Sequence, residues 1–253
     1  MLRIEHLSKS FGGLQALDDV SIEAPLGHVT GLIGPNGSGK STLFDTATGV
    51  VPMDHGHIEF DGKPVKTPRL DIMARRGVLR TFQVPRVAAG LTVLEHLMLA
   101  PTSGSRESYL ELLAPWAVRR LREDRSGRLE AAQEMAATLG LRKVRNDLAG
   151  SLSGGQLKLL TLGVVLMVRP RMLLLDEPLA GVNERVIEVI VQLLRRQCAE
   201  GTGILLIEHN MSVMWEACST IYAMSQGRII AHGHPQEVRR DPLVGSAYLG
   251  RGA

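Results

Sequence analysis

The feature that most constrains the fold is a glycine-rich stretch, GPNGSGKST, at residues 34–42. The β-prone run Val29–Ile33 leads into it, and Ser41–Thr48, a plausible helix, follows it. A strand, a glycine-rich loop and a helix in this order surround a phosphate group with backbone N–H groups. The alternative is a chance glycine-rich turn, but the flanking strand and helix favour a phosphate-binding loop. The candidate phosphate-binding residues are Gly34, Pro35, Asn36, Gly37, Ser38, Gly39, Lys40, Ser41 and Thr42.

Two side chains of this loop carry specific chemistry. Lys40 supplies a mobile cation for the β- and γ-phosphates of a nucleotide, and the Ser41 hydroxyl can bind Mg²⁺. The helix N-terminus adds its own partial positive charge. The loop therefore predicts a site for a nucleotide together with a metal ion.

Two further apolar runs end in acidic residues. Met172–Leu175 is followed by Asp176 and Glu177, and Gly203–Ile207 is followed by Glu208. Continuous apolar strands of this kind are typical of a parallel sheet that is covered on both faces. Ligands bind outside the carboxyl ends of the strands in such sheets, so these polar residues are expected at the binding edge.

The residues at these strand ends suggest hydrolytic chemistry. We expect Asp176 to hold the water shell of Mg²⁺ and Glu177 to polarise an attacking water. The alternative, a solvated acidic pair that closes a strand, is less favoured once the phosphate loop is present. His209 could donate a hydrogen bond to a γ-phosphate, and the alternative is a polar strand end.

Two isolated residues have weaker signals. Gln83 follows the segment RTF at residues 80–82, where its amide could bond a metal-bound water, and the alternative is an exposed linker glutamine. Phe11, ahead of two glycines, could stack on an adenine ring. Packing in the core is the usual role of a lone phenylalanine and is the alternative.

The remaining segments indicate an α/β core with additions. We expect antiparallel strands at the N-terminal side and a helical insertion between residues 85 and 151, followed by an amphipathic helix. The expected strands are Met1–Glu23 and His57–Lys63, and the expected helices are Leu91–Ala100, Tyr109–Arg122, Leu129–Leu139 and Val186–Glu200.

Composition excludes several classes of protein. The chain has 253 residues and a net charge of +3, with its basic residues scattered, so we expect no nucleic acid partner. Cys198 and Cys218 lack metal-type spacing and are expected to be reduced thiols. We find no secretory signal and no apolar run near the roughly 18 residues that a membrane span requires. Any action at a membrane is expected from outside the bilayer.

A second glycine-containing loop, LSGGQ at residues 152–156, precedes an apolar run that is expected to be helical. Alone, it suggests a second anion site on the same chain. The order of phosphate loop, Gln83, LSGGQ, LLLDEP at residues 173–178 and His209 resembles the ATP-binding subunit of an ABC transporter. The resemblance covers essentially the whole chain, and LSGGQ is its most specific part because other P-loop ATPases lack it.

The resemblance implies how the second loop is used. In this family two ATP-binding subunits pack head to tail, and LSGGQ of one closes over the ATP that the other holds. Residues Ser153, Gly154, Gly155 and Gln156 would then bind the partner's nucleotide. The implied cofactors are ATP and Mg²⁺, with Lys40, Gln83, Glu177 and His209 as catalytic residues and Ser41, Gln83 and Asp176 as metal ligands.

The resemblance can be narrowed to a subfamily. The segments RTFQ, GLTVLEH, DEPLAGVN and LLIEHNM are similar to those of importers of branched-chain or other hydrophobic amino acids. The tail is similar as well, at residues 233–238, 241–242 and 246–250. Urea-type importers share much of this pattern, and a soluble ABC ATPase outside transport is a further alternative. The implied partners are a second ATPase subunit, two transmembrane permeases and, indirectly, a periplasmic binding protein. The implied location is peripheral, on the cytoplasmic side of the inner membrane.

The expected fold is α/β, with a P-loop NTPase core that contains a mixed sheet, an N-terminal antiparallel β-subdomain and an inserted α-helical subdomain. We expect the nucleotide-binding core at residues 1–82 and 160–226, the helical subdomain at 83–159 and a C-terminal tail at 227–253.

Overall fold

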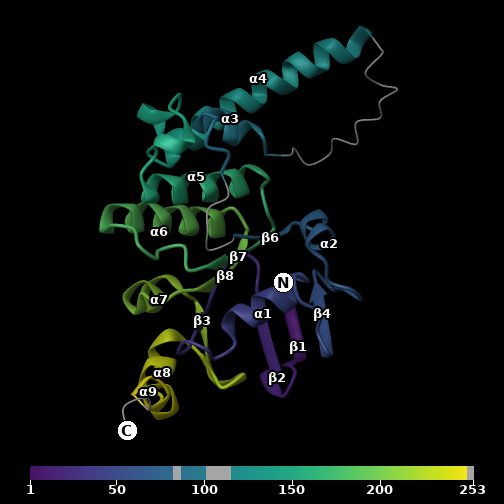
Figure 1. The fold of residues 1–253 in the computed structure, drawn as a ribbon, viewed down its shortest axis with the longest axis vertical. Coiled ribbons are helices and arrows are strands. Elements are labelled where there is room, and N and C mark those ends of the chain that lie inside the picture. The colour runs from purple at the N-terminus through teal and green to yellow at the C-terminus, as the bar shows by residue number, and fades with distance from the viewer. Residues whose placement is uncertain (82–86, 101–114, 250–253) are drawn as a thin grey trace. The chain divides into compact units, whose positions relative to one another are not determined.

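A computed structural model describes residues 1–81, 87–100 and 115–249 (Figure 1). Its contacts define two compact units. The first comprises residues 1–83, 170–180 and 191–253, and the second comprises residues 84–169 and 181–190. Residues 160–169 and 181–190, which we expected in the nucleotide-binding core, group with the second unit. The boundary expected at residue 160 falls inside α5 (Gly154–Met167), which is one continuous helix.

The first unit contains a six-stranded sheet in its described part, with the order β10-β9-β3-β8-β7-β6. Neighbouring strands pair in parallel from β9 to β6, and β10 pairs antiparallel with β9. Every residue of the three central strands β3, β8 and β7 is buried, which confirms the expectation drawn from their continuous apolar runs. The strands are β3 (Val29–Ile33), β6 (Val78–Arg80), β7 (Met172–Asp176), β8 (Gly203–Ile207), β9 (Thr220–Ser225) and β10 (Arg228–Gly233).

A second, antiparallel sheet belongs to the same unit and has the order β2-β1-β4-β5 among the described residues. It confirms the antiparallel strands expected near the N-terminus. The apolar residues of β1 and β2 join the helix α1 (Lys40–Thr48) and the central strands in one hydrophobic core. The strands are β1 (Leu2–Phe11), β2 (Leu14–Ala24), β4 (His55–Phe60) and β5 (Lys63–Pro64).

Short helices complete the first unit, and the longer α6 runs from the second unit into it. The predicted helix after the phosphate loop is α1, and the predicted amphipathic helix at Val186–Glu200 is α6. These helices are α1 (Lys40–Thr48), α2 (Leu70–Arg75), α6 (Glu184–Ala199), α7 (Met211–Ala217), α8 (Pro235–Arg240) and α9 (Pro242–Leu249).

The second unit is helical, as expected. Its helices α3 (Val93–Met98), α4 (Pro115–Thr138) and α5 pack against one another. A methyl group on Gly163 of α5 would lie 2.4 Å from Leu139 Cδ1, so the glycine allows close packing here. Two short 3₁₀ turns, Arg142–Val144 and Ala149–Ser151, lead into α5.

The prediction of separate helices at Tyr109–Arg122 and Leu129–Leu139 is wrong over the described residues, because α4 is continuous from Pro115 to Thr138. Residues 109–114 lie outside the described part. Gly127 is the weakest helix former between the two predicted helices. It costs about 1 kcal/mol relative to alanine, which is too little to end a helix that good helix formers flank.

Among the described residues, we find no helix long and apolar enough to cross a membrane.

Candidate nucleotide-binding site

The phosphate loop connects β3 to α1 and requires glycine at two positions. Gly34 has a φ of 154° and Gly39 a φ of 106°, in a region that side chains other than hydrogen disfavour. A Cβ on Gly34 would lie 2.2 Å from the carbonyl oxygen of Met224, and one on Gly39 would lie 2.6 Å from that of Ala16. The loop therefore depends on glycine both for its backbone conformation and for space.

Lys40 lies at the start of α1 and is almost fully buried. Its Nζ donates hydrogen bonds to the carbonyl oxygens of Gly34, at 2.7 Å, and Pro35, at 3.0 Å. Burial lowers the pKa of Lys40, while the nearby carboxylates of Glu177 and Asp176 raise it. The amine thus lies inside the loop and close to both acidic residues, where it can reach a bound phosphate.

Two hydroxyl groups of the loop, those of Ser38 and Ser41, are candidates for contact with a ligand. The Ser41 residue is exposed on the first turn of α1. The hydroxyl of Ser38 is buried and has no hydrogen-bond partner within the described residues. A buried polar group without a partner is rare in native proteins and calls for a ligand or water.

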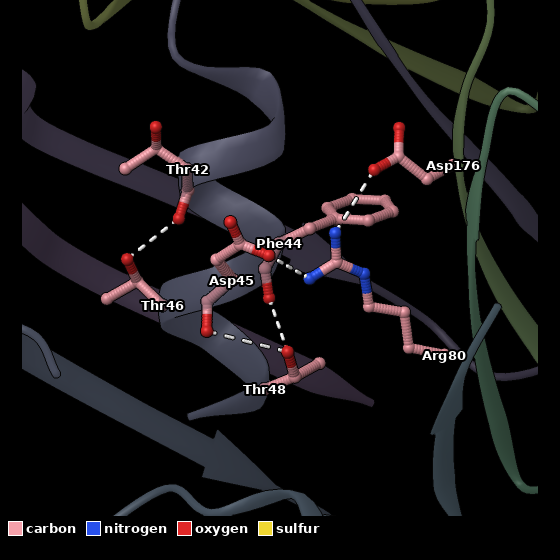
Figure 2. Close-up of polar contacts among 7 residues, drawn as sticks. All are labelled: Thr42, Phe44, Asp45, Thr46, Thr48, Arg80 and Asp176. Atoms are coloured by element: carbon pink, nitrogen blue, oxygen red, sulfur yellow. Dashed lines mark hydrogen bonds and ion pairs between the residues drawn. The ribbon is translucent and has the colours of Figure 1, made fainter. Parts of the chain in front are cut away.

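Asp176 ends β7, as predicted, and its side chain is 3% exposed. Its Oδ2 accepts a hydrogen bond from Arg80 Nη2 at 3.1 Å (Figure 2). Its Oδ1 is buried and has no hydrogen-bond partner in the part of the chain that the structure describes. Burial raises the pKa of Asp176, and the Arg80 guanidinium opposes this effect. The arrangement leaves one carboxylate oxygen for a cation or its water shell.

Arg80 is a residue that the sequence analysis did not single out. Its Nη1 also donates a hydrogen bond to Asp45 of α1, so one guanidinium bonds to two carboxylates (Figure 2). Nearby threonines of α1, Thr46 and Thr48, bond instead to backbone carbonyls of their own helix. In the sequence, Arg80 was only part of the RTFQ segment, and nothing local pointed to carboxylates on distant elements.

Glu177 and His209 are brought together by the ends of β7 and β8, two paired strands. His209 Nε2 lies 2.9 Å from Glu177 Oε1. The backbone of Glu177 has a φ of 50°, an uncommon conformation for a residue with a side chain, and its N–H donates to the Ile207 carbonyl. Such backbone strain is often found at functional sites. The side chain predicted to polarise the attacking water and the one predicted to bond the γ-phosphate are therefore adjacent.

Glu208 also has a role that the sequence did not reveal, because we treated it as a strand end. It is 3% exposed and accepts hydrogen bonds from the backbone N–H groups of Leu179, at 2.5 Å, and His209, at 3.0 Å. Burial raises the pKa of Glu208, and these N–H groups oppose the shift. The carboxylate joins the loop after Glu177 to the loop that carries His209.

Phe11 lies at the end of β1 and is 48% exposed, with Lys9 Nζ 5.4 Å from its ring centroid. Exposure of this size contradicts core packing, so its ring is available to a planar ligand. Burial raises the pKa of Tyr248 of α9, and a backbone hydrogen bond from Gly34 opposes this shift. Gln83 lies outside the described residues.

LSGGQ forms the N-terminus of α5 in the second unit. Ser153 is the N-cap residue, and its Oγ accepts a hydrogen bond from the N–H of Gln156 at 3.3 Å. The Gln156 side chain accepts one from the N–H of Ser153 at 2.9 Å, which completes a capping box. Ser153 and Gly154 are exposed, and Gly155 is half-buried, with room for a Cβ limited by Val186 at 3.2 Å. The exposed helix N-terminus suits an anion.

The sequence of the chain matches known protein families and relatives. Residues 17–180 match the ABC transporter family, and residues 228–253 match the family described as "Branched-chain amino acid ATP-binding cassette transporter". A probable branched-chain amino acid transport ATP-binding protein, LivG of Archaeoglobus fulgidus, is 34% identical over 99% of this chain and 95% of its own. The lipopolysaccharide export ATP-binding protein LptB of Escherichia coli is 32% identical over 98% and 97%.

Solved structures agree with these matches. The ADP conformation of an ATP-binding cassette of an ABC transporter is 36% identical, with a TM-score of 0.83 over 99% of both chains. A nucleotide-free cassette is 34% identical, with a TM-score of 0.82 over 98% of both chains. Both likenesses support the predicted fold. The chain belongs to the ABC transporter family and is one of its nucleotide-binding, ATP-hydrolysing subunits.

Proposed function

We propose that this chain powers an importer of branched-chain or other hydrophobic amino acids. The observation that carries the proposal is the match of residues 228–253 to a branched-chain amino acid cassette family, outside the part that matches ABC transporters in general. The described part of the matched segment contains β10, α8 and α9. LivG of Archaeoglobus fulgidus, whose name carries the same assignment, aligns over 99% of the chain.

Export is the second candidate. LptB, named for lipopolysaccharide export, aligns over 98% of this chain at an identity only slightly lower than that of LivG. A urea-type importer and a soluble ABC ATPase fit the same motifs. The C-terminal match favours amino-acid import over these alternatives.

In the proposed reaction, the phosphate loop and Lys40 bind the β- and γ-phosphates of ATP, and Phe11 stacks on adenine. Glu177 accepts a proton from the attacking water, and His209 donates a hydrogen bond to the γ-phosphate. The amide of Gln83 would bond a water of the Mg²⁺ shell. Within the described residues, we find no group of three or more metal-binding side chains of the His, Cys, Asp and Glu types. A nucleotide-borne Mg²⁺ needs fewer protein ligands, because phosphates and water supply the others.

The unpartnered Oδ1 of Asp176 and the exposed Ser41 fit such an ion. When bound, Mg²⁺ would neutralise charge on the β- and γ-phosphates. The residues of this chain then supply the orientation: Asp176 would hold the ion's water shell, and Ser41 would bind it directly.

We further propose that two ATPase subunits pack head to tail, so that Ser153, Gly154, Gly155 and Gln156 of one close over the ATP of the other. The helix N-terminus of α5 supports this role, since its N–H groups favour a phosphate. Closing and opening of the dimer would drive two transmembrane permeases at the cytoplasmic face of the inner membrane. A periplasmic binding protein would deliver the substrate.

The experiment is reconstitution of the chain with its permeases in vesicles, together with the periplasmic binding protein. ATP-dependent uptake of labelled leucine, absent with Glu177→Gln, is expected. The chain should also sediment with membranes only when a permease is coexpressed. Membrane binding without any permease, or hydrolysis stimulated only by an exported lipid, would contradict the proposal.

A further inference from the structure

Arg80 connects the two elements that carry the candidate metal ligands. Ser41 belongs to α1, and Asp176 ends β7. The Arg80 guanidinium donates to Asp45 of α1 through Nη1 and to Asp176 through Nη2, the latter at 3.1 Å (Figure 2). A single side chain thus spans from the phosphate-loop helix to the acidic strand.

The position of Asp45 makes this connection relevant to the metal. Asp45 is four residues after Ser41, so both residues lie on the same face of α1, one turn apart. A bond that fixes Asp45 therefore also fixes the turn that presents the Ser41 hydroxyl. The bond to Asp176 occupies Oδ2 and leaves the buried Oδ1 without a hydrogen-bond partner in the described chain.

The surroundings hold Arg80 in one orientation. Its side chain is 6% exposed, and its guanidinium carbon lies 5.5 Å from the centroid of the buried Phe44 ring. Its backbone is held as well, since Arg80 pairs with Leu174 and the next N–H, of Thr81, donates to Leu174. A planar, always-charged group on an aromatic face can bond two carboxylates at once, whereas a lysine ammonium presents one point charge.

We propose that Arg80 is a positioning residue for the metal–nucleotide site. It fixes Asp176 through one oxygen, directs the other oxygen to the water shell of the ion, and sets the spacing between Asp176 and Ser41. This inference rests on the Mg²⁺ site of the proposed function. It adds a residue that acts on the metal through Asp176 and α1, without touching the nucleotide.

The test measures metal affinity directly on the full chain. Mn²⁺ is titrated in the presence of a non-hydrolysable ATP analogue, and the free ion is followed by electron paramagnetic resonance. The affinity for the analogue in excess chelator is measured alongside, and thermal unfolding reports on folding. The variants are Arg80→Lys, which keeps the charge, and Asp45→Asn, which releases α1 from a partly exposed position.

The chain offers a matched control in Arg171→Lys. Arg171 also pairs with an aspartate, Asp61, at 2.8 Å and also lies over an aromatic ring, that of Phe60, at 5.7 Å. It precedes β7, at the end opposite Asp176, and is half exposed. This control changes the same kind of pair away from the candidate metal ligands.

Arg80→Lys is expected to weaken Mn²⁺ binding by about 10- to 100-fold, the usual effect of losing an outer-sphere partner. Its metal-free affinity for the analogue should stay within about twofold, and Arg171→Lys should match the wild type. Asp45→Asn should weaken Mn²⁺ binding in the same direction, and it decides the matter if Arg80→Lys does not fold.

Unchanged Mn²⁺ affinity in the folded variants would overturn the inference. An equal loss of analogue affinity with and without metal would also overturn it, because Arg80 would then support only the fold. If the wild type binds the analogue no more tightly with Mn²⁺ than without it, the proposed metal site itself fails.

Discussion

His209 Nε2 and Glu177 Oε1 lie 2.9 Å apart at the ends of two paired parallel strands. Both side chains are therefore positioned by the paired strands that they follow. Glu208 holds the two strand ends together, since its buried carboxylate accepts hydrogen bonds from backbone N–H groups of both strand-end loops. A base and a hydrogen-bond donor held in this way need little rearrangement to act on a γ-phosphate and its attacking water.

The first prediction concerns the base. Glu177→Gln keeps the size of the side chain but removes its ability to accept a proton, so steady-state ATP hydrolysis should fall by at least about 100-fold. ATP binding should persist, and an ATP-trapped dimer should accumulate. Phosphate release and size-exclusion chromatography measure the two effects. Glu216→Gln, an exposed site, is the control. Turnover at the wild-type rate would exclude Glu177 as the base.

The second prediction concerns LSGGQ. Replacing Ser153 with tyrosine should block closure over a partner's ATP, lowering hydrolysis at high protein concentration while leaving ATP affinity of the isolated monomer unchanged. The substitution also removes the N-cap of α5, which costs about 1 kcal/mol. Thr92→Ala removes the equivalent cap of α3, so it controls for stability alone. A tenfold loss of monomer affinity would contradict a role in the partner's site.

The sequence predicted most of the core because its signals are local. Apolar runs that end in polar residues identified β3, β7 and β8, and these strands place the phosphate loop, Asp176 and His209 at one edge of the sheet. Such runs carry their information within a few residues of chain. The resemblance added the family, which the matches over residues 17–180 confirm.

What could not be predicted depends on contacts between distant residues. Arg80 and Asp176 are separated by 96 positions, and no local pattern relates a guanidinium to a carboxylate at that separation. Glu208 resembled an ordinary strand end because its partners are backbone N–H groups of another loop. The capping box of Ser153 and Gln156 is a different case, since their spacing of three residues is typical of one. We interpreted these residues only as ligands of a nucleotide.

The third prediction contrasts two glycines. Gly39→Ala should unfold or distort the phosphate loop, because the new Cβ would lie 2.6 Å from the Ala16 carbonyl oxygen at a φ of 106°. We expect loss of ATP binding and a decrease of at least about 2 kcal/mol in the free energy of unfolding. Gly127→Ala is the control, since a Cβ there meets nothing within 4 Å beyond its own helix and the residue lies in α4, outside both glycine-containing loops. Urea unfolding and nucleotide titration are measured for both variants. Equal effects of the two substitutions would contradict the requirement for glycine at position 39.

The fourth prediction concerns the two thiols and pH. Burial raises the pKa of Cys218 from 9.0 to about 12 and that of Cys198 from 9.0 to about 11. The thiolate is the reactive form, so alkylation by iodoacetamide at pH 8 should be slower in the native chain by roughly 100-fold or more. Labelling followed by mass spectrometry measures this, with the urea-unfolded chain as the reference.

The same shifts give a sign for stability. A raised pKa in the folded state means that the stabilisation from the neutral thiols is complete below pH 9 and is lost as the pH rises toward 12. The free energy of unfolding should therefore decrease across this alkaline range, and Cys218→Ala should reduce the decrease because it removes the more strongly shifted thiol. Two results would show that this thiol is not buried in solution. One is the same alkaline dependence of the free energy of unfolding in the wild type and in Cys218→Ala, and the other is alkylation of native Cys218 at the rate of the unfolded chain.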